Sequence, residues 1–260
     1  GDSPMRLNPD QAETWALNGS SSSADGEDGL VTADPYLAVF YPSGRTNSVT
    51  GQQIVVPPSH MILRTIALSD DRSYPWFAPA GTRRGTVDNA SAIGYINSTT
   101  GNFISIGVTE GDRDALYAQA VNPLTFLPGT GLVNYGNKTR ASTPSALDRI
   151  NVARLVAYIR SSLNRIAKAF IFEPNDKLTR DELKGAIEQF FNDLTAKRGV
   201  FDYLVVCDES NNTAERIDRN ELYVDIAIEP IKSVEFIYIP IRLKNTGEIE
   251  SGNVASSNDV

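Results

Sequence analysis

The chain has very few of the residues from which metal centres, disulfide scaffolds and catalytic triads are built. Among 260 residues there is one histidine, His60, one cysteine, Cys207, and two methionines. One residue of each kind cannot make a metal site of the usual Cys and His type, although a site made of carboxylates alone stays open. A single cysteine forms no disulfide within the chain, and a serine triad would have to use His60 as its base. We expect no cofactor, no metal and folding in a reducing compartment.

Long apolar runs are also missing. No stretch approaches the roughly 18 consecutive apolar residues that cross a bilayer, and the N-terminus lacks the basic start and apolar core of a signal peptide. A net charge of -8 argues against a surface that binds nucleic acid or anionic membrane throughout. The 41% of hydrophobic residues is enough for a core, in one large domain or two small ones.

The composition changes along the chain and predicts three parts. Residues 1–29 are polar and rich in Ser, Gly and Asp, which predicts a flexible segment, with residues 1–4 ahead of Met5 as a tag remnant. Residues 30–243 form the expected core domain, with a variable, loop-rich insertion at residues 82–108. Residues 244–260 lose all apolar periodicity and predict a mobile tail.

Two helices are predicted in the first half of the core, after a short strand at residues 36–41 that prolines bound on both sides. Ser59 is the expected N-cap of a helix over residues 60–69. Thr109 and Asp112 have the spacing of a capping box for a helix over residues 113–120.

The second half predicts two long helices followed by three strands. Apolar residues recur at helical spacing over residues 145–170, and Thr179 with Glu182 has the capping-box pattern for a second helix that Gly199 ends. The strands are expected at residues 201–207, 222–228 and 234–243, and Pro240 confines the last to an edge. The predicted fold class is therefore mixed α/β, with a sheet packed against two long helices and edge strands available for pairing between subunits.

One glycine-rich loop leaves an enzymatic alternative open. The segment from Gly129 to Thr139 resembles a phosphate-binding loop, but Asn137 lies between Gly136 and Lys138, and the following helix starts several residues too late. We weigh a structural turn against a nucleotide-binding enzyme that uses this loop. The remaining candidates have both structural and chemical interpretations: His60 and Cys207, and the carboxylates Glu173, Asp176, Asp208 and Glu209.

Basic residues gather on one predicted helix. Between Lys138 and Lys168 there are seven basic residues and one acid in a chain of charge -8. Five of them cover the arc opposite the apolar stripe, which predicts either a solvated face or the docking site of an acidic partner. No aromatic residue on that face could stack with bases, so an acidic protein surface is favoured over nucleic acid. The five are Arg149, Arg154, Arg160, Arg165 and Lys168.

A series of short motifs, in one fixed order over about residues 34–243, resembles the core of contractile phage tail sheath proteins. The motifs lie at residues 36–42, 55–59, 75–81, 122–123, 129–131, 135–139, 149–152, 172–176, 207–208, 211–213 and 224–225.

The resemblance implies a structural protein of the virion, assembled in the host cytoplasm, and not an enzyme. Sheath subunits form stacked hexameric rings, a helical polymer, around an inner tail tube and contract to drive the tube through the host envelope. The implied partners are neighbouring sheath subunits, the tube, the baseplate and the tail terminator, with no nucleic acid and no membrane insertion. Terminal arms of this family add strands to neighbouring subunits, which makes Phe236, Tyr238, Ile239 and Ile241 the strand-pairing candidates.

The resemblance also places a helix of the core against the tube, and the five basic residues are the candidates for that contact. Family members usually carry more chain ahead of this core. We therefore expect this chain to be part of a longer parent, and expect it to be a monomer by itself.

Overall fold

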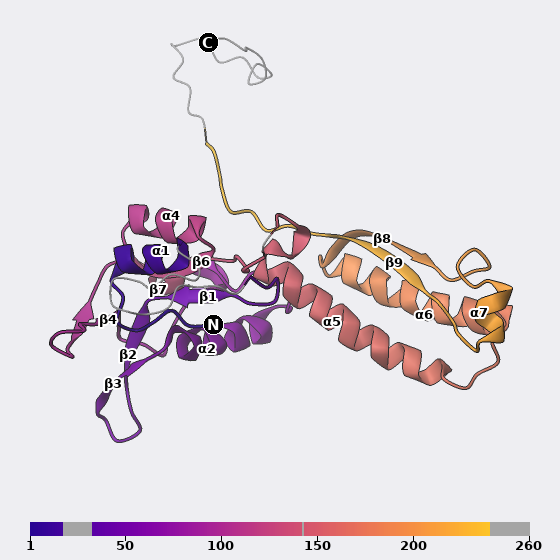
Figure 1. Ribbon diagram of the computed structural model, residues 1–260, viewed down its shortest axis with the longest axis horizontal. Coiled ribbons are helices and arrows are strands. Elements are labelled where there is room, and N and C mark those ends of the chain that lie inside the picture. Colours follow the sequence, from indigo (N-terminus) through magenta and orange to yellow (C-terminus); the bar gives the residue numbers. More distant parts are fainter. Residues whose placement is uncertain (18–32, 142, 240–260) are drawn as a thin grey trace, which may run out of the picture.

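A computed structural model describes residues 1–17, 33–141 and 143–239 of the chain. These residues form two lobes with separate hydrophobic cores, and the helix α5 (Ile150–Ala167) leads from one lobe into the other (Figure 1). The first lobe comprises the described residues up to 148, and the second runs from α5 to Pro230. The mixed α and β fold class predicted from the sequence is confirmed.

Two small sheets form the first lobe. In the three-stranded sheet, of order β1-β6-β7, β1 runs parallel to β6 and β7 forms an antiparallel hairpin with β6. The four-stranded sheet, of order β3-β2-β4-β5, is antiparallel throughout. Their strands are β1 (Val39–Tyr41), β2 (Ser43–Asn47), β3 (Gln53–Val56), β4 (Ala92–Ile96), β5 (Phe103–Ser105), β6 (Val121–Leu127) and β7 (Gly131–Asn134).

The region expected to be a loop-rich insertion at residues 82–108 instead contributes β4 and β5 to a sheet. Ile93 of β4 is buried in the first core. Gly94 allows β4 to approach β5, because a Cβ at that position would lie 1.9 Å from the carbonyl oxygen of Ile104. Gly94, one of the glycines that suggested a loop, therefore serves close strand packing.

Four helices belong to the first lobe: α1 (Pro9–Leu17), α2 (Pro58–Arg72), α3 (Gly81–Arg84) and α4 (Glu110–Ala118). The capping box of Thr109 and Asp112 at the start of α4 is confirmed. The N-cap predicted for α2 is wrong, because Pro57 occupies that position and Pro58 opens the helix. Ser59 lies within the first turn, where its hydroxyl donates to Asp2.

The prediction of a flexible segment at residues 1–29 is wrong for residues 1–17. The first three residues lie along β1, where the amino group of Gly1 donates to the carbonyl of Ala38. Leu7 and Trp15 are 0% and 5% exposed in the first core. Burial of these few apolar residues outweighs the polar composition that predicted flexibility. Residues 18–29, and the predicted tail at residues 244–260, lie outside the described residues.

The second lobe has the predicted arrangement of a small sheet against two long helices. The antiparallel strands β8 (Val200–Val206) and β9 (Asp225–Pro230) pack on α5 and on α6 (Lys177–Ala196), and α7 (Ala214–Asp218) connects them. Asp176, not Thr179, caps α6, since its carboxylate accepts from the backbone N–H of Thr179. The helix therefore begins two residues before the predicted capping box.

The strand expected at residues 234–243 is not formed where it is described. Residues 231–239 belong to no strand, and in Figure 1 this segment leaves the body near the junction of the two lobes. A strand needs a neighbour to take its backbone hydrogen bonds. The remaining residues, 240–243, lie outside the described part of the chain.

Trp76 joins the two lobes. It belongs to the loop between α2 and α3 of the first lobe, yet it is buried in the core of the second lobe. Its indole nitrogen donates to the carbonyl of Lys197 at the end of α6, 3.1 Å away. Its ring stacks on Tyr74 at 4.8 Å and packs against Tyr158 of α5 at 5.3 Å. A Cβ on Gly199 would lie 3.3 Å from the indole, so glycine there leaves room for the ring.

We expect Trp76→Ala to lower the free energy of unfolding by about 3–5 kcal/mol, the usual cost of deleting a buried aromatic side chain. Urea denaturation followed by circular dichroism measures this loss. Phe236→Ala is the control, because Phe236 is 69% exposed and should change stability by less than about 0.5 kcal/mol. Equal stability of the two variants would contradict the role given to Trp76.

Candidate assembly interface

The sheet of the second lobe has unpaired edges. β8 and β9 pair only with one another among the described residues, so each strand keeps one edge whose backbone groups have no strand partner there. A two-stranded sheet of this kind can accept a further strand from another chain. The exposed apolar side chains Phe201 and Leu204, which are 74% and 60% exposed, lie on β8.

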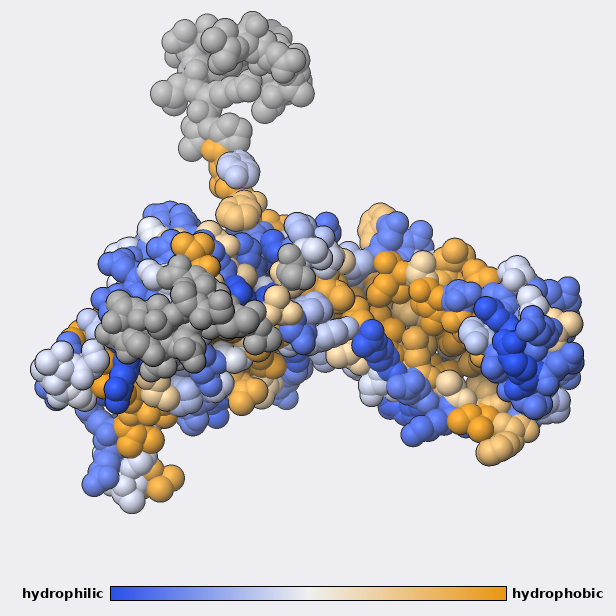
Figure 2. Space-filling view, viewed as in Figure 1, coloured by the Kyte–Doolittle hydropathy of each residue, from blue (hydrophilic) through white to orange (hydrophobic). Residues whose placement is uncertain are grey.

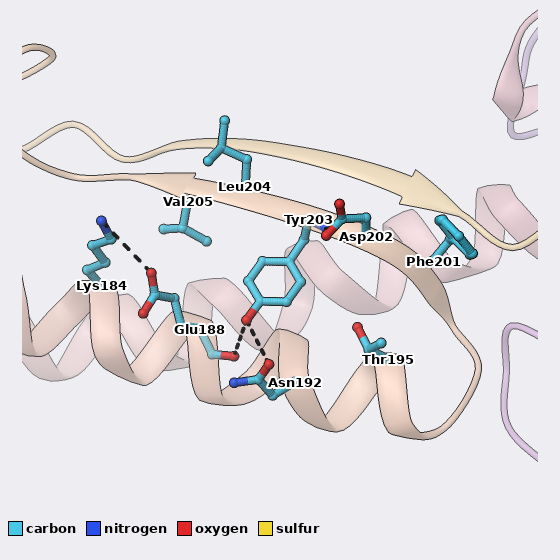
Figure 3. A pocket seen from close by; sticks show the side chains of 9 residues that line it. All are labelled: Lys184, Glu188, Asn192, Thr195, Phe201, Asp202, Tyr203, Leu204 and Val205. Atoms are coloured by element: carbon cyan, nitrogen blue, oxygen red, sulfur yellow. Dashed lines mark hydrogen bonds and ion pairs between the residues drawn. The ribbon is translucent and has the colours of Figure 1, made fainter.

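A shallow groove of about 520 Å³ runs beside β8 (Figure 3). Residues of α6 and β8 line it and none of β9 does, so it opens along the edge of β8 that β9 leaves free. Tyr203 points from β8 towards the helix, and its hydroxyl lies 2.8 Å from Oδ1 of Asn192 and 3.3 Å from the carbonyl oxygen of Glu188. This contact fixes the spacing between strand and helix at the groove.

The segment after β9 carries apolar side chains into solvent. Phe236, Ile237, Tyr238 and Ile239 are 69%, 76%, 88% and 76% exposed. Apolar surface is visible both on this segment and over the second lobe in Figure 2. We call residues 231–239 the C-terminal arm. Three of the four strand-pairing candidates, Phe236, Tyr238 and Ile239, lie on it; Ile241 lies outside the described residues.

The prediction of an unneutralised basic face is wrong for two of its five members. Arg149 pairs with Asp148 and Glu235, and Arg154 pairs with Asp70 of α2. Arg160, Arg165 and Lys168 are exposed and have no carboxylate partner in the described part of the chain. Arg160 also lies 5.8 Å from the ring centre of Tyr36. We call these three residues the basic surface.

The glycine-rich loop has the geometry of a hairpin turn. Gly129, in the turn between β6 and β7, and Gly131, the first residue of β7, have positive φ angles of 80° and 94°, which glycine adopts without strain. Lys138 does not point back into this turn: its ammonium donates to the carbonyl of Tyr117 and lies 4.2 Å from the ring centre of Tyr117. Asn137 is buried and donates to Asn151. The loop therefore lacks the arrangement that holds a phosphate.

The other candidates of the sequence have local structural roles. Asp176 caps α6, and the backbone N–H of Thr179 lowers the pKa of its carboxyl. Asp208 accepts from Ser210, whose hydroxyl lowers the pKa of Asp208. Cys207 is buried, and burial raises the pKa of its thiol. His60, Glu173 and Glu209 are exposed. Within the described ranges no group of three or more His, Cys, Asp or Glu residues could hold a metal ion.

Where the structure describes the chain, it contains no helix with the length and apolarity that crossing a membrane requires.

The architecture is that of contractile sheaths. The sheath complex of an extracellular contractile injection system in its contracted state aligns with a TM-score of 0.71 over 93% of this chain and 62% of that one, at 20% identity. The contracted helical sheath of the anti-feeding prophage aligns with a TM-score of 0.70 over 89% of this chain and 64% of that one, also at 20% identity. At this identity the likeness defines the fold.

Sequence comparison gives the family. Residues 142–244 match the phage tail sheath C-terminal domain. The tail sheath protein of Vibrio phage KVP40 is 37% identical over 182 residues, and that of Enterobacteria phage T4 is 35% identical over 192 residues. The chain belongs to the phage tail sheath family. The matches cover 70% and 74% of this chain but only 26% and 28% of those relatives, so it spans about a quarter of their length.

Two features of the interface were not predicted from the sequence. Phe201 and Leu204 of β8 are exposed, although they belong to a largely apolar run, and such a run is equally consistent with a buried strand. Glu235 lies within an apolar segment, and its partner Arg149 is 86 residues away in sequence. No local pattern joins the two.

We expect ATP with magnesium to leave the melting temperature unchanged, because the hairpin holds neither amides nor Lys138 in position for a phosphate. Thermal shift measurement checks this directly. A ligand present at 100 times its dissociation constant would stabilise the folded state by about 2.7 kcal/mol, a rise that the assay detects easily. A rise that depends on nucleotide concentration would restore the enzymatic alternative.

Proposed function

We propose that this chain is a structural subunit of a contractile phage tail sheath, which polymerises as stacked hexameric rings around a tail tube and contracts to drive the tube through the host envelope. The observation that supports it most directly is that one chain carries both halves of a strand-pairing contact: the unpaired sheet edge beside the groove, and an exposed apolar arm.

The arm suits pairing with another subunit. An extended strand rises about 3.3 Å per residue, so Phe236 to Ile239 alone extend about 13 Å. The segment turns away from β8 and β9 near the lobe junction, so its partner edge belongs to a neighbouring copy (Figure 1). Backbone hydrogen bonds would supply the affinity, and the apolar side chains would bury against the receiving lobe. Such an arm keeps subunits connected while their bodies rearrange.

The basic surface suits an acidic partner, and the inner tail tube is the partner we propose for it. Arg160, Arg165 and Lys168 lie on or directly after the distal half of α5 and remain hydrated. Exposed charge pairs contribute little each and are screened by salt, so they can hold the extended sheath and still be released during contraction. Arg149 and Arg154 are no longer candidates, because carboxylates of this chain neutralise them.

The remaining assignments follow from the same role. Baseplate and tail terminator proteins would contact the two ends of the polymer, which assembles in the host cytoplasm and becomes part of the virion. We propose neither a nucleic-acid ligand nor insertion into a membrane. The rival function, a nucleotide-binding enzyme, has no support from the geometry of the hairpin.

We expect the double substitution Ile237→Pro and Tyr238→Pro in the full-length parent to abolish polymer formation while the monomer keeps its melting temperature. Adjacent prolines remove backbone donors from both edges of the arm, so at least one lost donor faces the receiving strand. Electron microscopy scores the polymer. The matched control is Ile237→Thr with Tyr238→Thr, which keeps both donors and β propensity; normal sheaths from the proline variant would refute strand pairing by the arm.

We expect the triple change of Arg160, Arg165 and Lys168 to glutamate to prevent co-assembly with tail tubes while leaving subunit folding intact. Co-sedimentation with purified tubes at low and high salt measures the interaction. The control replaces Arg72, Arg83 and Lys177, three exposed cations on other elements, with glutamate, which changes the net charge by the same amount. Unchanged tube binding by the α5 variant would show that the tube docks elsewhere.

A further inference from the structure

The C-terminal arm does not become free where β9 ends. Ile231 donates its backbone N–H to Gly199, 3.3 Å away, and this is the last backbone bond that ties the arm to the sheet. Beyond it the arm turns towards the junction of the lobes and contacts it through side chains. The buried amide of Asn137, which follows β7, donates to the hydroxyl of Ser233 at 3.1 Å.

Glu235 is held more firmly than any other residue of the arm. Both its carboxylate oxygens accept from the guanidinium of Arg149, at 2.5 and 3.1 Å. The side chain of Glu235 is only 16% exposed and that of Arg149 is 26% exposed, so solvent screens the pair less than a surface pair. A two-pronged Arg–carboxylate contact fixes orientation as well as distance.

The surroundings of Glu235 are also polar and specific. Burial raises the pKa of Tyr117, and the nearby charge of Glu235 raises it further. Burial lowers the pKa of Lys138, whose ammonium donates to the carbonyl of Tyr117 and whose backbone forms an isolated bridge with Arg149. Tyr117 of α4, Lys138 after β7 and Arg149 at the start of α5 therefore form one series of contacts that ends at Glu235. The next residue, Phe236, is 69% exposed.

We infer that Glu235 and Arg149 form an anchor that fixes the point from which the arm is free, so that the segment available to a neighbouring subunit begins at Phe236. Without the anchor, the last contact of the arm would be that of Ser233 with Asn137, and two more free residues would lengthen the tether by about 7 Å. A longer tether lowers the effective concentration of the arm at the receiving edge and loosens its register. The effect on pairing with a neighbouring subunit rests on the proposed function, whereas the anchoring of the arm by Glu235 and Arg149 does not.

Spin labels test the anchor in the isolated chain. Val234→Cys places a label on an exposed position between Ser233 and Glu235, and Tyr238→Cys places one beyond the anchor. Cys207 is 1% exposed and stays unlabelled. In the otherwise unchanged chain we expect a slow component at position 234 and fast motion at position 238. Glu235→Gln, which removes the charge, should abolish the slow component at 234 and leave 238 unchanged.

Matched variants separate the anchor from general loss of structure. Glu229→Gln removes an exposed carboxylate of β9 and should keep the slow component. Arg149→Lys keeps the positive charge but loses the two-pronged contact with the carboxylate, and should reduce the slow component at position 234. The exchange of Arg149→Glu with Glu235→Arg should restore it. Melting curves exclude variants that fail to fold. If the label at position 234 is equally mobile in the unchanged chain and in Glu235→Gln, the anchor is overturned.

Assembly of the full-length parent tests what the anchor does. We expect Glu235→Gln to reduce the yield of regular polymer and the charge exchange to recover it. Normal polymer from Glu235→Gln, with its label at 234 mobilised, would overturn the role of the anchor in pairing. A parent that never forms tubes, even unchanged, would overturn the proposed function while the label result still decided the anchor.

Discussion

The contact between Trp76 and the end of α6 is the constraint on which the rest of the molecule depends. Besides the continuous helix α5, an indole of the first lobe joins the two cores: it fills the second core and donates to a carbonyl left without an intrahelical partner. Glycine at position 199 leaves the space that the ring needs. The free edge of β8 and the basic surface therefore have defined positions relative to the first lobe.

A single copy of the molecule has backbone groups, on the sheet of the second lobe and on the arm, that pair with no strand in the described residues. The sheet of β8 and β9 is paired on one side only, and the arm is extended without a ladder in the described residues. The sequence pattern at residues 234–243 predicted a strand, and its β-forming side chains are real, but a strand is completed by its neighbour's hydrogen bonds. The preference for strand conformation is a property of one segment, whereas strand pairing requires a second segment beside it.

Sequence periodicity was sufficient for the elements whose signal is local. The apolar stripe of α5 and the capping box at Thr109 appear where expected, and the alternation predicted over residues 222–228 appears in β9 over Asp225–Pro230, because each depends on residues a few positions apart. The failures share a different cause. The helix α1 is ordered by burial in the first core beside the distant helix α4, and Arg154 is neutralised by Asp70, 84 residues away. Neither relation leaves a trace in neighbouring residues.

The helix α5 crosses from one core to the other, with Ile150 buried in the first and Ile159 in the second. Its 18 residues make a rod about 27 Å long. A rotation of about 10° about its buried N-terminal end would sweep the far end through roughly 5 Å, which exceeds the ~4 Å reach of an ion pair. Such a tilt at the junction of the lobes would move Arg165 and Lys168, at the far end of α5, by about the reach of an ion pair.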